Sequence, residues 1–365
     1  MTTTSFCNHI CPINNKRNNL LCRDAFLTFF FLLFSISMPD RAIAQQSIRL
    51  VFWNVENLFD IFDDTTRNDD AFTPGGQNHW SNQRYERKLT NITKTLVALG
   101  RHGDNTFSMP TVVGMAEVEN DKVLRDLCQG TPLRRFGYGH VHFDSPDRRG
   151  IDVALLYRKE QFTPFLSQAI NVSDSSQDFL TRDLLLVEGT LFSGDTLALI
   201  ICHFPSKLGG TTSDKRRAIV AGKLRNIMDS VQTSHPFGTL VVMGDFNGAP
   251  DEDELSVICR SIKGISYTNL MADMEPGKGS YRHQDHWSCL DQIIVSTSTA
   301  EPNSDLNLRL KDKRGKIFDA PFLLLDDDKH LGKKVFRTFL GMRYQGGYSD
   351  HLPVYIDMNA GNSGK

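Results

Sequence analysis

The amino-acid sequence predicts one large α/β domain over residues 46–360. Apolar runs of strand length alternate with segments of helical spacing along this range. No stretch rich in proline, glycine or serine divides it, so the range contains no candidate interdomain linker. With 365 residues, 40% hydrophobic and 23% charged, the chain has the composition of a globular protein with a sizeable core.

The first strand is predicted at residues 48–54, an apolar run that ends on the polar Asn54. Residues 60–80, rich in Asp, Asn, Gly and Thr, indicate a long surface loop. A helix is predicted from Ser81 to Leu99, and Gly100 ends it. Its apolar side chains recur on one face, at Leu89, Ile92, Leu96 and Leu99.

The middle of the chain continues this alternation, and two of its strands end on polar residues. A buried strand ends on Glu117, and the second strand of a hairpin leads into His203. The predicted elements are strands at residues 111–117, 138–143, 152–157, 184–192 and 196–202, and helices at residues 118–129, 215–231 and 252–261.

The run from Thr239 to Asp245 predicts a buried strand that passes through Gly244 and is followed by Asn247. Residues i and i+2 of an extended strand point to the same side, so Asp245 and Asn247 project together. A carboxylate beside an amide suits work on a phosphate, since one handles a proton or a metal and the other donates a hydrogen bond. The structural alternative is an Asx-turn, which Asp and Asn favour.

Further polar groups occupy strand ends in the C-terminal part. A strand at residues 289–295 carries Asp291, and Asp350 and His351 precede the last strand, residues 354–358. Residues 298–347, between these strands, are polar and irregular in sequence. They predict an insertion near the site.

Eight polar residues at strand ends indicate one shared site. Buried carboxylates are costly unless they are paired, hydrogen-bonded or bound to a metal. Converging carboxylates with an asparagine favour a hard divalent cation, Mg²⁺ or Mn²⁺, and the absence of Cys-x-x-Cys spacing disfavours zinc. The eight residues are Asn54, Glu117, His203, Asp245, Asn247, Asp291, Asp350 and His351.

Residues 1–44 have the pattern of a cleavable signal peptide. Basic residues precede an apolar run from Ala25 to Met38, and Ala42-Ile43-Ala44 then gives a small-x-small cleavage site with Gln45 next. The apolar run, about 14 residues long, is shorter than the roughly 20 that span a bilayer, although an uncleaved membrane anchor is the alternative. We therefore expect a secreted or periplasmic protein of residues 45–365, and a monomer, since coiled-coil heptads are absent from the sequence.

Loss of the leader would lower the formal net charge from −2 to −4, because four basic and two acidic residues leave with it. A mildly acidic protein is not built around a broad nucleic-acid surface, although local basic patches remain open. In an oxidising compartment the remaining cysteines can form disulfides or serve as small core residues. They are Cys128, Cys202, Cys259 and Cys289.

Five segments together resemble the endonuclease/exonuclease/phosphatase superfamily, in family order over roughly residues 48–358. They are Phe52-Trp53-Asn54-Val55-Glu56-Asn57, Gly114-Met115-Ala116-Glu117, Gly244-Asp245-Phe246-Asn247, Leu290-Asp291-Gln292 and Ser349-Asp350-His351-Leu352-Pro353. The resemblance implies a four-layer α/β sandwich of two packed mixed β-sheets flanked by helices, with the site at one edge. Together with the leader, it indicates a secreted bacterial-type member.

The resemblance also implies roles for these residues. Glu117, Asn54 and Asp350 match positions on the metal side of the family's site. His351 matches the general base toward the attacking water, and Asp291 matches the aspartate that orients this histidine. A His–Asp pair of this kind raises imidazole basicity and fixes the tautomer.

The remaining positions match groups that handle the substrate. Asp245 and Asn247 match the pair that handles the nucleophile and the scissile phosphate, and His203 matches a phosphate-contacting histidine of the deoxyribonuclease-like branch. Asp152 lies in a recurrent family segment but is equally suited to capping a turn. Three basic residues after His203 fit substrate contacts or a solvated helix face: Lys207, Lys215 and Arg216.

Three functions remain open at this stage. The first is a secreted, metal-dependent phosphodiesterase, a nuclease with DNA or RNA as its partner. The second is a phosphatase or phospholipase-like enzyme on sugar or lipid phosphates, because the core chemistry of a fold does not fix its substrate. The third is a catalytically silent binding protein, which the complete set of expected residues disfavours.

Overall fold

The computed structural model describes residues 47–103, 106–174, 179–207, 210–236, 238–301 and 307–360. The predicted signal peptide lies outside these residues. No helix within the described residues is both long enough and apolar enough to cross a membrane.

The first β-sheet is mixed, because β1 runs parallel to β2 and antiparallel to β19. Its strand order is β13-β19-β1-β2-β4-β3, and β14 also pairs with β19. The strands are β1 (Ser47–Leu58), β2 (Val112–Val118), β3 (Tyr138–His142), β4 (Asp152–Arg158), β13 (Leu308–Leu310), β14 (Lys316–Ile317) and β19 (Val354–Ala360).

The second sheet is also mixed, with β7 parallel to β8 and its other pairs antiparallel. Its strand order is β5-β6-β7-β8-β12-β9. The strands are β5 (Phe162–Ile170), β6 (Leu184–Leu191), β7 (Thr196–His203), β8 (Thr239–Asp245), β9 (Tyr267–Asn269) and β12 (Asp291–Ser296).

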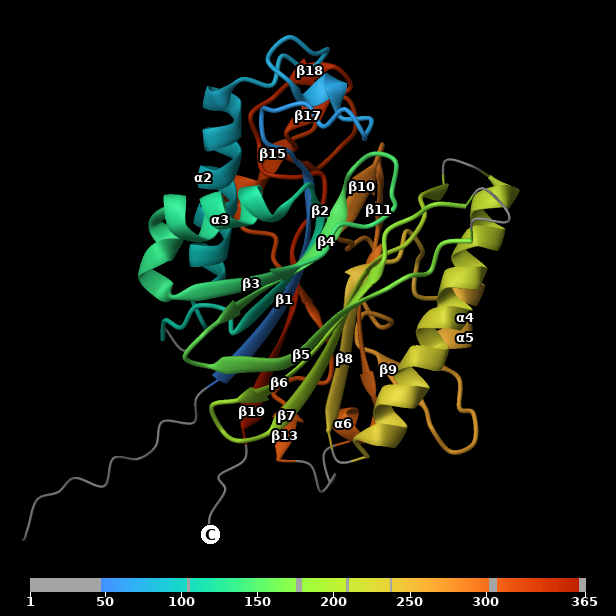
Figure 1. Cartoon of the computed structure of the whole chain (residues 1–365). Helices are drawn as coiled ribbons and strands as arrows, with labels where there is room; N and C mark the ends of the chain where they lie inside the picture. The colour runs from blue at the N-terminus through green and yellow to red at the C-terminus, as the bar shows by residue number, and fades with distance from the viewer. Residues whose placement is uncertain are drawn as a thin grey trace, which may run out of the picture. The chain divides into compact units, whose positions relative to one another are not determined.

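Helices cover the outer face of each sheet, which gives the four layers visible in Figure 1. Helices α2 and α3 lie on the first sheet, and α4 and α5 lie on the second. The helices are α2 (Asn82–Leu99), α3 (Asp121–Gly130), α4 (Thr211–Ser234), α5 (Asp253–Cys259) and the short α6 (Thr297–Ala300). Short 3₁₀ turns occupy Asp70–Phe72, Pro132–Phe136 and Pro321–Leu323. The predicted four-layer sandwich is confirmed.

Three apolar clusters fill the spaces between the layers. Strand β1 contributes to two of them, because Val51 and Trp53 face the helices while Phe52 faces the second sheet. Both faces of this strand are therefore buried, which explains its almost unbroken apolar sequence. In the space between the sheets, Phe52 and Ile201 both lie against Gly114, where a side chain would not fit without a shift.

The observed elements agree with most sequence predictions. The predicted face of α2 is buried, and Asn120 caps α3 by accepting a hydrogen bond from the amide of Val123 at 3.0 Å. The prediction of an irregular segment at residues 298–347 is wrong in part. Two of its strands, β13 and β14, extend the first sheet, and it also contains the hairpins β15 (Leu324–Asp326) with β16 (Lys333–Val335) and β17 (Phe339–Leu340) with β18 (Arg343–Tyr344).

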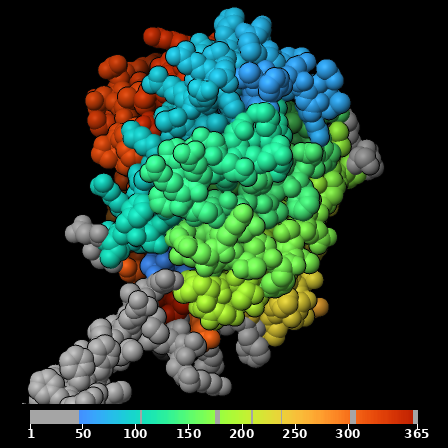
Figure 2. Space-filling view, turned by 60° about the vertical axis from the view of Figure 1, so that its left-hand side comes forward, coloured from blue at the N-terminus to red at the C-terminus, as the bar shows by residue number. Residues whose placement is uncertain are grey.

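The hairpins of this insertion lie beside α2, far from it in sequence. Figure 2 shows C-terminal segments in orange and red packed next to the cyan region of the chain. Asn91 of α2 donates hydrogen bonds to the carbonyls of Gly346 and Gly347 at 3.2 and 2.7 Å. The insertion is therefore attached to the first sheet's helical layer, next to the strand ends that carry the polar residues.

Candidate active site

Strand pairing brings the polar residues to one edge of the two sheets. In the parallel pair β7 and β8, His203 lies opposite Asp245. In the antiparallel pair β8 and β12, Asp245 lies opposite Asp291. In the first sheet, Asn54 lies opposite Ala116, the residue before Glu117. The sequence alone could not give these registers.

The backbone at this edge departs from regular strand geometry. Glu117 and Asn247 have φ of 62° and 48°, a left-handed conformation that costs free energy in residues other than glycine. The pairing of β2 with β4 shifts register between Ala116 and Val118. A bulge of this kind redirects a side chain, so Glu117 reaches the edge because β2 is irregular there.

A histidine between two carboxylates forms the centre of the site. Nδ1 of His351 lies 2.7 Å from Oδ2 of Asp291, and its Nε2 lies 3.7 Å from Oδ2 of Asp245. All three residues are buried. Burial alone would lower the pKa of His351, but the charges of Asp291 and Asp245 raise it well above its ordinary value. The ring is therefore strongly basic, with Nδ1 turned to Asp291.

Asp245 is the most crowded of the acidic residues. Its Oδ2 accepts a hydrogen bond from Nδ2 of Asn54 at 3.0 Å, and its Oδ1 accepts one from the amide of Asn247 at 2.9 Å. Burial, opposed by His351 and reinforced by Asp291, raises the pKa of Asp245 to about 7. Such a shift accompanies proton-handling groups in active sites.

His203 completes the centre on the side of the second sheet. Its Nε2 lies 3.6 Å from Oδ2 of Asp245, and its buried Nδ1 has no hydrogen-bond partner among the described residues. Burial, together with Arg182 and Arg149, holds the pKa of His203 well below its ordinary value. A neutral ring with an unused nitrogen can donate to or accept from a bound phosphate.

Glu117 and Asp350 are held by contacts outside this centre. Oε2 of Glu117 accepts a hydrogen bond from the amide of Asn57 at 2.8 Å, and Oδ2 of Asp350 accepts one from Arg337 at 2.8 Å. The other oxygen of each carboxylate has no hydrogen-bond partner within the part of the chain that is described. Oε1 of Glu117 lies 3.9 Å from Arg149, and the side-chain carbonyl of Asn54 accepts a hydrogen bond from the Glu56 amide at 3.0 Å. These oxygens and Oδ1 of Asp350 are hard donors, which fit Mg²⁺ or Mn²⁺.

The buried oxygen Oδ1 of Asp291 also has no hydrogen-bond partner among the described residues. It belongs to a group, Asp245, Asp291 and His351, whose potential ligand atoms lie within 4.8 Å of one another. An oxygen-rich edge with unsatisfied carboxylates is thus compatible with a divalent cation, and the residues present fit one.

Sequence comparison identifies the family of this site. The model of the Endonuclease/Exonuclease/phosphatase family matches residues 49–360. The chain belongs to this family. Its members hydrolyse phosphoesters with a divalent metal, so this chain is a phosphoester hydrolase. Among curated proteins none matches the chain in sequence.

Solved structures of the same fold are distant in sequence. The catalytic domain of human Nocturnin is 17% identical, with 86% of this chain and 94% of that chain covered and a TM-score of 0.51. Humanized D. rerio TDP2 is 15% identical (86% and 99%, TM-score 0.53). A mannosyl-6-phosphatase of Bacteroides thetaiotaomicron is 14% identical (85% and 99%, TM-score 0.51). At these identities the likeness shows the fold.

The residues for which the sequence also allowed a purely structural role lie apart from Asp245, Asp291 and His351. Asp152 accepts hydrogen bonds from the amide and hydroxyl of Ser145, so it caps the turn before β4. It also lies 3.3 Å from His142 in a separate group with Asp144. Lys207 pairs with Glu252. Lys215 is exposed on α4, and Arg216 is half-buried there, over the ring of Phe179.

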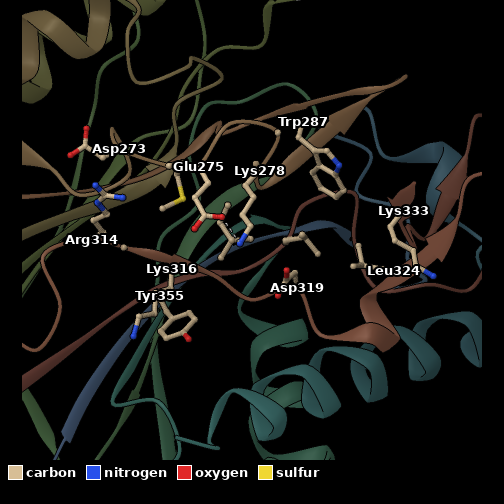
Figure 3. Close-up of a pocket in the computed structure, with 16 residues that line it drawn as sticks. Asp273, Glu275, Lys278, Trp287, Arg314, Lys316, Asp319, Leu324, Lys333 and Tyr355 are labelled. Carbon is tan, nitrogen blue, oxygen red and sulfur yellow. Dashed lines mark ion pairs between the residues drawn. The ribbon is translucent and has the colours of Figure 1, made fainter. Parts of the chain in front are cut away.

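A cavity of about 510 Å³ lies near the polar strand ends, but none of the eight residues predicted from the sequence lines it. Figure 3 shows its mixed rim, in which Lys278 and Glu275 form an ion pair at 3.0 Å near Trp287. Leu352, which follows His351, contributes to the wall. The eight predicted residues and this cavity are therefore separate features of the molecule.

Sequence reasoning missed several residues around the site. Tyr281 packs against His351 with ring centroids 4.9 Å apart. Arg149 donates to Asn57 at 2.8 Å and lies 3.9 Å from Glu117, whereas Arg337 reaches Asp350 from the insertion. Tyr281 begins the short strand β10 (Tyr281–His283), and the two arginines lie in loops. None of the three follows an apolar run, so the pattern that revealed the other residues could not reveal them.

Proposed function

We propose that this chain is a secreted phosphodiesterase that uses a divalent cation to hydrolyse DNA or RNA. The array Asp291–His351–Asp245, with the 2.7 Å contact between Asp291 and His351, carries the proposal. It supplies an oriented imidazole at an edge that also presents oxygen donors for a cation. Acidic and amide groups in this combination suit attack of water on phosphorus.

His351 is the proposed general base. Its Nδ1 is directed at Asp291, so Nε2 is the nitrogen that takes a proton from water when the ring is in its neutral form. Oδ2 of Asp245 lies 3.7 Å from that nitrogen, and Asp245 orients the water that Nε2 deprotonates. Asp291 stabilises the imidazolium that forms after the transfer, as a buried carboxylate does beside a catalytic histidine.

The phosphate is held by groups of the second sheet, at the ends of β7 and β8. Asn247 and the neutral His203 are placed to hydrogen-bond its non-bridging oxygens. Glu117, Asn54 and Asp350 would hold Mg²⁺ or Mn²⁺. That cation neutralises developing negative charge on the phosphoryl oxygens when bound.

Two similarities support different substrate classes. One D. rerio TDP2 structure of the same fold contains a single-strand DNA product, which favours a nucleic acid. The mannosyl-6-phosphatase has the same fold at a similar TM-score, so a sugar phosphate is the second candidate. His203, which resembles a residue of the deoxyribonuclease-like branch, favours the first.

The test is hydrolysis by residues 45–365 with Mg²⁺ and then with EDTA. The substrates are plasmid DNA, single-stranded RNA, bis-p-nitrophenyl phosphate, mannose 6-phosphate and sphingomyelin. We expect EDTA-sensitive cleavage of DNA or RNA. Activity confined to mannose 6-phosphate or to the lipid would overturn the nuclease proposal while retaining the site. No turnover of any substrate would contradict the proposed hydrolysis.

Secretion is a separate proposal supported by the N-terminal sequence alone. After expression of the full chain in a bacterial host, we expect a protein that begins at Gln45 in the periplasm or medium. Intact mass and N-terminal sequencing measure this directly. A full-length protein retained in the membrane fraction would show that the apolar run is an anchor.

A further inference from the structure

The segment of the insertion around Thr338 is fixed to the end of β1 by a buried carboxylate. Oε2 of Glu56 accepts a hydrogen bond from the amide of Thr338 at 2.6 Å, and its Oε1 accepts one from Phe339 at 3.3 Å. Glu56 lies two residues beyond Asn54 and is 3% exposed. The insertion is therefore registered against the strand that supplies a metal-side residue.

A buried ammonium group fixes the same segment from the other side. Nζ of Lys88 on α2 donates to the Thr338 hydroxyl at 2.6 Å and to the Tyr348 carbonyl at 2.8 Å, and Lys88 is 1% exposed. Burying a lysine and a glutamate is costly unless both are well bonded. Here both side chains form hydrogen bonds to the same part of the insertion, around Thr338, so the position of that segment is closely defined.

The residue just before the anchored Thr338 is Arg337, which contacts the metal-side residue Asp350. Its Nη2 donates to Oδ2 of Asp350 at 2.8 Å, and its Nε lies 3.6 Å from Oε1 of Glu56. The side chain is 32% exposed. A guanidinium keeps its positive charge at any ordinary pH.

Two buried arginines with a structural role bond differently from Arg337. Arg49 donates to Asp357 through two nitrogens and to two backbone carbonyls through a third, and Arg225 uses its three nitrogens on Asp229 and three carbonyls. Their side chains are 5% and 3% exposed. Arg337 makes one hydrogen bond among the described residues, through Nη2. Its buried Nε faces Glu56 at 3.6 Å, and its Nη1 makes no hydrogen bond among these residues.

We propose that Arg337 is a substrate-binding residue, supplied by the insertion, that contacts an anionic oxygen of the bound phosphoester next to Asp350. The proposal rests on the proposed function, because it places the phosphoester at the same edge. A guanidinium with unused donors matches the oxygens of a phosphoryl group in geometry and charge. The insertion thereby contributes to phosphate recognition from outside the strand ends.

The alternative role for Arg337 is to position Asp350 without touching substrate. The two roles differ in measurable ways. Replacement of a residue that only positions Asp350 would alter the Mg²⁺ concentration needed for half-maximal activity and leave phosphate binding in EDTA unchanged. Replacement of a substrate-binding residue would lower the affinity for phosphate even when no cation is present.

The experiment compares Arg337→Ala and Arg337→Lys with the wild type, all as residues 45–365. Arg343→Ala is the matched control, because Arg343 is an exposed arginine of the same insertion with no ion pair among the described residues. Calorimetry measures the Kd of inorganic phosphate in EDTA, and kinetics with Mg²⁺ measure KM and kcat on bis-p-nitrophenyl phosphate.

We expect Arg337→Ala to raise the phosphate Kd and the KM by about 10-fold or more, the scale of one charge-assisted hydrogen bond. Added guanidinium should restore part of the phosphate affinity that Arg337→Ala loses. The phosphate Kd of Arg337→Lys should lie between those of the wild type and Arg337→Ala. An unchanged phosphate Kd in Arg337→Ala, or an equal loss in Arg343→Ala, would overturn the proposal. A wild type that hydrolyses nothing, yet shows the Arg337-dependent phosphate Kd, would support it while the hydrolytic function fails.

Discussion

Glu117 and Asn247 show how much of this site depends on individual backbone conformations. Each has a positive φ, and Glu56 and Asn57 near the end of β1 share this feature. Left-handed residues other than glycine are held only where their surroundings fix them, and they cluster at functional positions. The side chains that meet at the edge do so because several strands end irregularly, rather than by regular strand alternation.

Glu117 is the residue whose replacement should affect the cation most directly. Glu117→Gln removes one negative charge but keeps the shape and the bond from the Asn57 amide. We expect the Mg²⁺ concentration for half-maximal activity to rise by at least about 10-fold, the usual scale for changes at metal sites. Glu301→Gln, at an exposed glutamate, should leave the Mg²⁺ titration unchanged. An identical titration in both variants would place the cation elsewhere.

His351 should control the chemical step. In His351→Ala, Asp291 and Asp245 lose the imidazole between them, and we expect kcat to fall by about 10²-fold or more. His286→Ala, at an exposed histidine, provides the control, and thermal unfolding shows whether the variant is folded. Near-normal turnover in folded His351→Ala would remove this residue from the mechanism.

The sequence was informative about residues only where a strand ends. Asp245, Asp291 and His351 follow or begin apolar runs, and the structure brings them into contact. Lys88 and Glu56 gave no signal, because a charged residue on a helix or after a strand is ordinarily exposed. Arg337 was hidden for a second reason, since its position depends on those two buried partners.

At the scale of elements, the short strands were the ones that the sequence could not show. The first part of the insertion pairs with β19 through β13 and β14, each of two or three residues. Strand β5 was also missed, because it is an edge strand with a largely exposed pattern and a register shift after Pro164. Apolar periodicity identifies a strand only when one face is buried over several residues.

The contact between β2 and β7 can be tested through Gly114. A methyl group at this position would lie 2.8 Å from Cδ1 of Ile201 and 3.2 Å from Cδ2 of Phe52. Gly114→Ala should therefore lower the free energy of unfolding by ~1–3 kcal/mol through overpacking between the sheets. Ile201→Val removes the closest atom, so the double variant should be more stable than the sum of the single effects predicts. Denaturant titration measures all three, and strict additivity would argue against this contact.

For the whole molecule, the layered architecture followed from the family resemblance and not from the strand pattern alone. Apolar runs such as residues 48–54 show that both faces of a strand are buried, but they do not say which layer covers which face. The structure answers this with three clusters, one between the two sheets and one under each pair of helices. The central cluster shares a sheet with each of the outer ones.

Each apolar cluster contains one buried free cysteine, so labelling of these thiols can measure when each layer becomes exposed to solvent. Cys128 is on the buried face of α3, Cys289 lies between the sheets and Cys202 lies under α4. Burial raises the pKa of Cys128 and of Cys289 to about 12, and that of Cys202 well above its ordinary value. The thiolate is the reactive form, so all three are protected twice, by access and by protonation.

Because the central cluster joins the outer ones, we expect the layers to open together. With increasing guanidinium at pH 8, Cys128, Cys202 and Cys289 should become labelled by a thiol reagent at one common midpoint. Cys259 is only half-buried, with a pKa raised by burial to about 11, and should react earlier. Peptide mass spectrometry assigns each label. Earlier labelling of Cys202 than of Cys128 would show instead that the layer under α4 and α5 opens as an independent unit, as local unfolding does in less cooperative domains.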